Sequence, residues 1–121
     1  MFPENLKYNN DYSWIKIENN IATIGVIEKS AKKVEEFVFA MLPSVGDELK
    51  IGDTYITLEA VKWSGHLKSP VSGKVIEVND AIFENPSLIN SDPYGSWIVK
   101  VEIDEIDELI NCNEAIEYYN K

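Results

Sequence analysis

The sequence has one cysteine, one histidine, few positive charges and no long apolar run, and each shortage limits what the protein can be. Cys112 alone cannot form an intramolecular disulfide, a thiolate metal cluster or a Cys-x-x-Cys redox pair. No stretch approaches the roughly 20 apolar residues that a membrane-spanning helix needs. Residues 1–5 lack the basic opening and apolar block of a signal peptide, so we expect a cytoplasmic protein.

Acidic residues outnumber basic ones by 21 to 11, which gives a formal net charge of −10. Such a charge repels phosphate backbones and anionic lipid, so we expect neither nucleic acid nor a membrane as a partner. The sequence also contains no phosphate-binding glycine loop and no histidine or cysteine arrangement typical of catalysis. We therefore expect a protein that is not an enzyme and has no metal site.

The pattern of apolar residues predicts a single β-rich domain over residues 1–121. Apolar and polar residues alternate over 13–17 and again over 21–26, and the turn signal at 18–20 between them predicts a hairpin. Further strands are predicted at 37–42, 54–60, 74–78 and 97–101. Many short strands with few helices indicate a sandwich or a partly closed barrel.

Two helices are predicted beside these strands. Residues 30–36 have the composition of a short helix, with Ser30 as its N-cap. From Asp104 onward the apolar spacing changes to that of an amphipathic helix. Its apolar face would consist of Ile106, Leu109, Ile110, Cys112, Ile116 and Tyr119. The sequence therefore predicts a C-terminal helix that begins near residue 104.

Lys62 is the residue whose position suggests a chemical role. It lies between two predicted strands, where a tight turn would hold its amine in solvent on a rigid support. This placement suits a lysine that another enzyme must reach and acylate. Exposed lysines are common on turns, so the placement alone does not single out Lys62.

The segment 59–73 resembles the lipoylation motif of glycine-cleavage H proteins. In that family a Glu-Ser-Val-Lys core is followed, after a few residues, by Ser-Pro-Val-Ser-Gly, and here Lys62 stands at the lysine and Ser69 to Gly73 at the second block. Further matches follow in the same order along nearly the whole chain. They are Trp14, Ile21 to Gly25, Phe39, Leu42-Pro43, Val45 to Asp47, Glu77 to Asn79, Asn85-Pro86, Leu88 to Asn90, Asp92 to Gly95 and Trp97.

The resemblance implies a barrel-sandwich hybrid of two antiparallel sheets, with short helices and a C-terminal α-helix. It also implies that lipoate is attached to Lys62 and acts as a swinging arm, while the carrier itself catalyses nothing. The implied partners are the lipoyl-attaching enzyme, glycine decarboxylase, aminomethyltransferase and dihydrolipoamide dehydrogenase. The implied function is transfer of an aminomethyl group from glycine decarboxylase to the aminomethyltransferase, after which dihydrolipoamide dehydrogenase reoxidises the arm.

Five other residues are candidates for recognition by the lipoyl ligase or for docking of the arm: Ser13, Glu59, Val61, Trp63 and His66. Glu59 matches a position that helps the ligase recognise its target. Ser13 and His66 replace a glutamate and an aspartate that, in the family, pair with the ammonium group of the loaded arm. Each lost carboxylate removes a charge-assisted hydrogen bond of roughly 1.5–3 kcal/mol. Trp63 stands where small polar residues are usual, and either packs on its own hairpin or marks a different partner.

Four hypotheses follow from the sequence. The first is a glycine-cleavage carrier, favoured by the resemblance. The second, favoured by the missing carboxylates, is an H-like lipoate-binding protein that serves heterodisulfide-reductase-like sulfur-oxidation proteins or a lipoyl relay. A biotin carrier is disfavoured because Val61 and Trp63 occupy the places where such carriers have methionines. The fourth is an unmodified interaction domain, which the intact motif around Lys62 disfavours.

Overall fold

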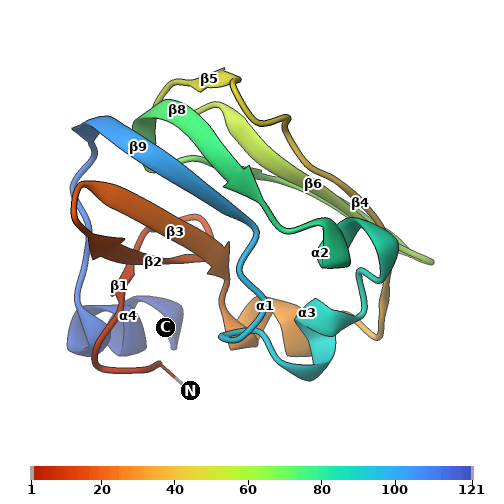
Figure 1. Ribbon diagram of the computed structural model, residues 1–121. Helices are drawn as coiled ribbons and strands as arrows, with labels where there is room; N and C mark the ends of the chain where they lie inside the picture. Colours follow the sequence, from red (N-terminus) through yellow and green to blue (C-terminus); the bar gives the residue numbers. More distant parts are fainter. Residues whose placement is uncertain (1, 121) are drawn as a thin grey trace.

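Residues 2–120, which the computed structural model describes, form two antiparallel β-sheets with short helices and a C-terminal helix (Figure 1). One sheet has the order β1-β2-β3-β9-β8-β5 and the other β4-β6-β7. The strands are β1 (Lys7–Tyr8), β2 (Ser13–Glu18), β3 (Ile21–Val26), β4 (Phe37–Met41), β5 (Glu48–Leu49), β6 (Thr54–Ala60), β7 (Trp63–Lys68), β8 (Val71–Val78) and β9 (Val99–Ile106). The helices are α1 (Glu28–Lys33), α2 (Asp80–Glu84), α3 (Leu88–Ser91) and α4 (Cys112–Tyr119). The expected fold class is confirmed.

The alternation of side chains along the strands builds two apolar clusters. Neighbouring residues of a strand point to opposite faces of its sheet. In β2, Ile15 joins the main core, to which both sheets contribute, and Trp14 joins a second cluster with α4. The main core also includes Ile24 from the larger sheet and Leu58 from the smaller one. The two sheets therefore pack face to face, and α4 covers the outer side of β2.

The predicted hairpin of β2 and β3 is confirmed. Asn19 and Asn20 form its turn with positive φ angles of 49° and 64°, between the paired residues Glu18 and Ile21. Two residues with positive φ make the turn type whose twist matches that of paired strands. Asparagine adopts this conformation more readily than most residues, which explains why the turn signal was readable in the sequence.

The C-terminal helix begins later than predicted, so the expected start at Asp104 is wrong. Strand β9 continues to Ile106, because residues 103–106 pair with β8 as far as Val71. The chain then pairs with β1 through two backbone hydrogen bonds between Tyr8 and Ile110, each 2.8 Å long. Pairing with strands distant in sequence therefore outweighs the local helical pattern. No helix within residues 2–120 is long and apolar enough to cross a membrane.

Asn111 fixes the start of α4 through a capping box. Its side chain accepts a hydrogen bond from the backbone of Glu114, and the Glu114 carboxylate accepts one from the backbone of Asn111. We expect Asn111→Ala to lower the free energy of unfolding by about 1 kcal/mol, as for other lost N-caps. Urea unfolding followed by circular dichroism measures this change. Asn113→Ala is the matched control, and an equal loss in both variants would contradict the capping role.

Helix α1 also differs from its prediction. It spans Glu28–Lys33, is preceded by Ile27 without a side-chain cap, and ends before Glu35 and Glu36. The Asn90 side chain of α3 donates hydrogen bonds to the carbonyls of Ala31 and Val34 and accepts one from the backbone of Phe37. These three bonds from a distant residue hold residues 34–37 in an extended path, so that the helix ends at Lys33. The expected cap at Ser30 is wrong because the helix begins earlier, at Glu28, whose backbone N–H donates to the Tyr94 hydroxyl at 3.2 Å.

Candidate functional site

Lys62 lies in a two-residue turn between β6 and β7. Ala60 and Trp63 are paired across the hairpin, so that Val61 and Lys62 alone connect the strands, and both are exposed. Val61 is 86 % exposed, which shows how little the turn contacts the rest of the protein. In Figure 1 the hairpin that contains β6 extends past α2 at the edge of the molecule. The Lys62 amine is therefore open to a large partner.

The strands on either side give this turn a rigid support. Strand β6 pairs with β7 from Thr54 to Ala60, and its other edge pairs with β4. Ile56 and Leu58 of β6 are fully or almost fully buried in the main core. The backbone beneath Lys62 is thus held from three sides, while its side chain remains free. Such a combination suits covalent modification by another protein.

Glu59 and His66 lie together on the outer face of the hairpin. Glu59 is opposite Ser64, and Thr57 is opposite His66, so these side chains share one face of the two strands. His66 Nδ1 lies 2.9 Å from the Thr57 hydroxyl in a hydrogen bond. Both Glu59 and His66 are exposed, and they form a surface beside Lys62 that a modifying enzyme can contact.

Ser13 lies in the interior instead of on the surface beside Lys62. It has no exposed surface, and its hydroxyl oxygen lies 2.5 Å from that of Tyr55 in a hydrogen bond. Burial raises the pKa of Tyr55, so that the phenol keeps its proton throughout the physiological range. Docking of an arm directly against Ser13 would require this buried pair to open. The hydroxyl that replaces a carboxylate at position 13 is therefore part of the core.

The buried phenol of Tyr55 predicts a loss of stability in alkali. An unfolded chain loses this proton from about pH 10, whereas the folded protein, with its raised pKa, retains it. Because the folded state then binds more protons, the free energy of unfolding falls by up to about 1.4 kcal/mol per pH unit above about pH 10. Tyr55→Phe should reduce this slope. Urea unfolding at about pH 9, 10 and 11 measures it, and equal slopes in both proteins would contradict the assignment.

A groove runs beside the hairpin, with a volume of about 980 Å³. We call it the hairpin groove. One wall is the hairpin itself from Ala60 to Trp63, and Leu67 of β7 lines it as well. The other lining residues come from three separate segments of the chain. The first supplies Tyr12, the second supplies Lys29, Ser30, residues 33–36 and Val38, and the third supplies Tyr118 and Tyr119. The groove therefore begins at Lys62 and is built from segments distant in sequence.

Tyr12 and Tyr119 form an aromatic wall of this groove. Their ring centroids are 5.3 Å apart. The backbone N–H of Tyr12 donates to the Tyr119 hydroxyl at 2.8 Å, and that hydroxyl donates to the carbonyl of Asn9 at 2.6 Å. These bonds hold Tyr12 at a positive φ of 64°. Docking of α4 is thus required to complete the groove.

Glu35 and Glu36 are site residues whose place the sequence did not reveal. They line the hairpin groove together with Lys62 and are exposed. The sequence did not single them out, because a local pattern does not show which distant segment a residue will face. They supply carboxylates to this groove, which the buried Ser13 does not line.

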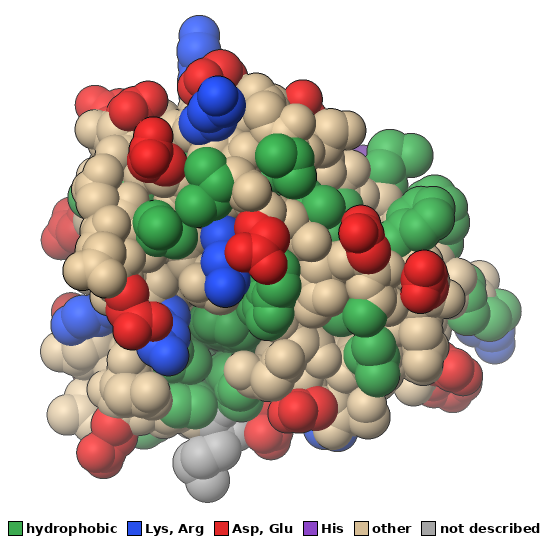
Figure 2. Space-filling view, in the orientation of Figure 1, with side chains coloured by type: hydrophobic (Ala, Val, Ile, Leu, Met, Phe, Trp, Pro, Cys, Tyr) green, Lys and Arg blue, Asp and Glu red, His purple; other side chains and the backbone are tan. Residues whose placement is uncertain are grey.

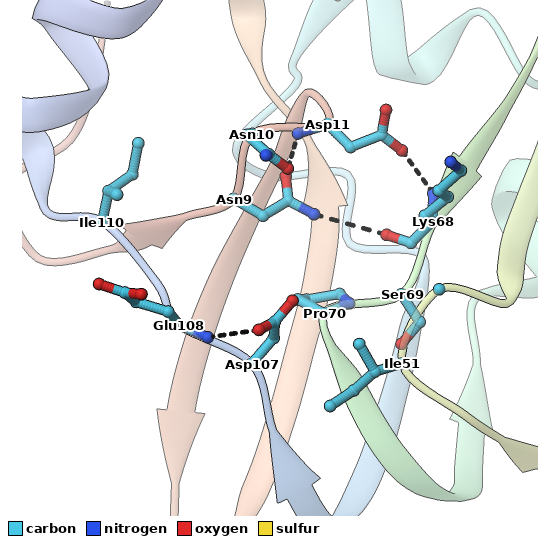
Figure 3. Close-up of a pocket in the computed structure, with 11 residues that line it drawn as sticks. Asn9, Asn10, Asp11, Ile51, Lys68, Ser69, Pro70, Asp107, Glu108 and Ile110 are labelled. Carbon is cyan, nitrogen blue, oxygen red and sulfur yellow. Dashed lines mark hydrogen bonds between the residues drawn. The ribbon is translucent and has the colours of Figure 1, made fainter.

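Asp11, an acidic residue two positions before Ser13, lies at a different groove of about 370 Å³ (Figure 3). Its carboxylate accepts a hydrogen bond of 2.7 Å from the backbone of Lys68, and the Asn9 side chain donates to the carbonyl of the same residue. Figure 3 shows both bonds directed at the end of β7. Asp11 therefore closes the edge of that strand and does not line the hairpin groove.

The acidic side chains of residues 2–120 do not gather at a metal site. Acidic side chains are spread over the face shown in Figure 2, among apolar and basic ones. Among the described residues, no group of three or more histidine, cysteine, aspartate or glutamate side chains is arranged to hold a metal ion. The hairpin groove, which Lys62 helps to line, is therefore the candidate site of this structure.

Comparison with known proteins agrees with this geometry. The family model described as "Glycine cleavage H-protein" matches residues 6–121. A glycine cleavage system H protein of Carboxydothermus hydrogenoformans is 46% identical over 113 residues, which cover 90% of this chain and 87% of the relative. A probable glycine cleavage system H protein of Thermoplasma volcanium is 37% identical over 112 residues, with 93% and 92% of the two chains covered.

A solved structure has the same fold. The crystal structure of a glycine cleavage system H protein from Mycobacterium marinum superposes with a TM-score of 0.92 at 28% sequence identity, covering 98% of this chain and 99% of that chain. The family model spans nearly the whole sequence, and the relatives have similar lengths and the same name. The chain therefore belongs to the glycine cleavage H-protein family, a family of lipoyl carriers.

Proposed function

We propose that this protein carries an aminomethyl group on a lipoyl arm attached to Lys62, between the enzymes of glycine cleavage. The observation that carries the proposal is the exposed Lys62 amine in a two-residue turn on a rigid hairpin. The residues present fit the lipoyl group, because the amine is accessible and a groove with apolar walls begins beside it. When bound, the group supplies a dithiolane that partner enzymes reduce, load and reoxidise.

The chain contributes a tether and a resting place. Because the cargo stays attached to the protein, it does not have to dissociate and find the next active site by diffusion, which raises its effective concentration. Acylation would also remove the positive charge of Lys62 and leave a neutral, flexible connection. The carrier needs no catalytic group of its own for this role, and we propose that it has none.

Glu35 and Glu36 support an aminomethyl cargo. A loaded arm ends in a cationic amine, and the hairpin groove offers two carboxylates near the hairpin. Lys29, which also lines the groove, donates to the backbone carbonyl of Tyr119 and to the Asn120 side chain, so that its charge is partly engaged elsewhere. In the family, carboxylates at the positions of Ser13 and His66 pair with the ammonium group of the loaded arm. We propose that Glu35 and Glu36 do so in this chain.

The outer face of the hairpin would serve recognition. Glu59, Val61 and His66 are exposed beside Lys62, and we propose that the lipoyl-attaching enzyme contacts them. Glycine decarboxylase, aminomethyltransferase and dihydrolipoamide dehydrogenase are the further partners of this proposal. The sulfur-oxidation and lipoyl-relay alternatives have no such support, since the relatives reported above are named for glycine cleavage. A cytoplasmic location stays a prediction.

Exchange of labelled bicarbonate into glycine tests this function. We expect the lipoylated chain, offered to glycine decarboxylase, to support exchange. The double variant Glu35→Gln/Glu36→Gln should lower the rate by roughly tenfold or more, because the loss of even one charge-assisted hydrogen bond of roughly 1.5–3 kcal/mol corresponds to about ten- to a hundredfold. Glu84→Gln, which changes an exposed glutamate of α2 outside the groove, is the matched control. Absence of exchange with the lipoylated chain would overturn the glycine-cleavage function.

A further inference from the structure

Trp63 follows Lys62 directly and is held in place from two sides. Its indole lies across Gly65, where an added β-carbon would meet the ring at 2.7 Å. The ring also packs against Phe37, with centroids 5.8 Å apart and planes at 53°. In spite of these contacts Trp63 is 38 % exposed. The indole is thus an immobilised aromatic surface that remains open to solvent.

This surface belongs to the hairpin groove and directly follows the attachment point of the arm in the chain. Trp63 and Leu67 line the groove together with Lys62. Side chains two residues apart along a strand point to the same face, so Trp63, Gly65 and Leu67 form one row on β7. An arm that starts at Lys62 and folds back along this row crosses the indole before it reaches Leu67.

An indole face suits both parts of a lipoyl arm. The alkyl chain gains free energy when apolar surface is removed from water, and a ring of this size offers a large apolar area. Divalent sulfur also makes favourable contacts with aromatic rings. Gly65 leaves the room that the indole needs to lie along the strand. A small polar side chain at position 63 would offer neither contact.

Resting on the function proposed above, we propose that Trp63 is a positioning residue for the lipoyl arm. Its indole is the platform on which the arm of Lys62 lies when the dithiolane is outside a partner's active site. Trp63 therefore sets the fraction of time for which the disulfide is withdrawn from solvent. Packing of Trp63 on Gly65 and Phe37 serves to fix this platform beside the attachment point.

The test is the rate at which a water-soluble phosphine reduces the dithiolane of the lipoylated chain. A small reductant requires no protein docking, so its rate reports the exposure of the disulfide. We expect Trp63→Ala to be reduced about two- to tenfold faster than the wild type, by the range of measured sulfur–aromatic contacts. Trp63→Phe, which keeps an aromatic ring, should lie between the two.

Two further variants separate the platform from general effects on stability. Gly65→Ala keeps the indole but must displace it, and it should accelerate reduction as Trp63→Ala does. Phe83→Ala removes an exposed aromatic ring that does not line the groove, and its rate should equal that of the wild type. Lipoylation should also quench tryptophan fluorescence in the wild type, but not in Trp63→Phe, where only Trp14 and Trp97 remain.

Intact mass, measured before reduction, distinguishes the possible failures. A lipoyl adduct at Lys62 together with equal reduction rates in the wild type and Trp63→Ala would overturn the platform and leave the carrier function standing. Absence of the adduct after treatment with a competent ligase would overturn both. Faster reduction in Trp63→Ala and Gly65→Ala, with the wild-type rate in Phe83→Ala, is the result that we expect.

Discussion

Lys62→Arg should abolish lipoylation, and with it all carrier activity, while the fold and its stability remain those of the wild type. The guanidinium keeps the positive charge but is not a substrate for amide formation. Lys62 is exposed in a two-residue turn, so that its replacement disturbs no packing. Intact mass after incubation with a lipoyl ligase, together with the bicarbonate exchange assay, measures both effects.

Lys50→Arg is the matched control for this experiment. Lys50 is also exposed, and it directly precedes the turn at Ile51 and Gly52. The Lys50→Arg variant should be lipoylated to the same extent as the wild type, because Lys62 is intact in it. An adduct that persists in Lys62→Arg, or that maps to another lysine, would remove the basis of the proposed function.

Gly73→Ala should cause the largest loss of stability of any substitution considered for this chain. Gly73 lies in β8, which pairs with β9 on one side and with β5 on the other. A β-carbon at this position would lie 1.9 Å from the backbone oxygen of Glu102 in β9. Backbone in a paired strand cannot yield as a flexible side chain does. We therefore expect a loss of about 3 kcal/mol, the upper end for overpacking, measured by urea unfolding.

Gly52→Ala distinguishes this clash from the general cost of replacing a glycine. Gly52 has a positive φ of 94°, and nothing lies within 4 Å of the position that a β-carbon would take. Only the strain of the left-handed backbone remains, which costs about 1–2 kcal/mol. Gly73→Ala should thus be clearly less stable than Gly52→Ala. Equal losses of stability in the two variants would show that the contact with Glu102 adds nothing to the general cost of replacing a glycine.

The elements that the sequence predicted well are those formed by local contacts. Residues 13–17, where apolar and polar residues alternate, and residues 54–60 were both predicted as strands, and both are strands in the structure. The two asparagines at 19–20 mark a turn because their own backbone preference favours it. Predictions failed at the start of α4 and at both ends of α1. At the start of α4, pairing with Val71 and Tyr8 decides the backbone path. At the two ends of α1 the bonds are to Tyr94 and Asn90, and all four partners are distant in sequence.

The candidate site divides in the same way. The sequence by itself determined the lysine in a tight turn and, through the resemblance of the surrounding motif, the family to which the chain belongs. Only the tertiary structure decided that Ser13 is buried, that Trp63 faces the groove, and that Glu35 lines it. The physical reason is that a turn depends on a few adjacent residues, whereas a groove exists only where separate segments pack together. Here Tyr119 of α4 completes it from the far end of the chain.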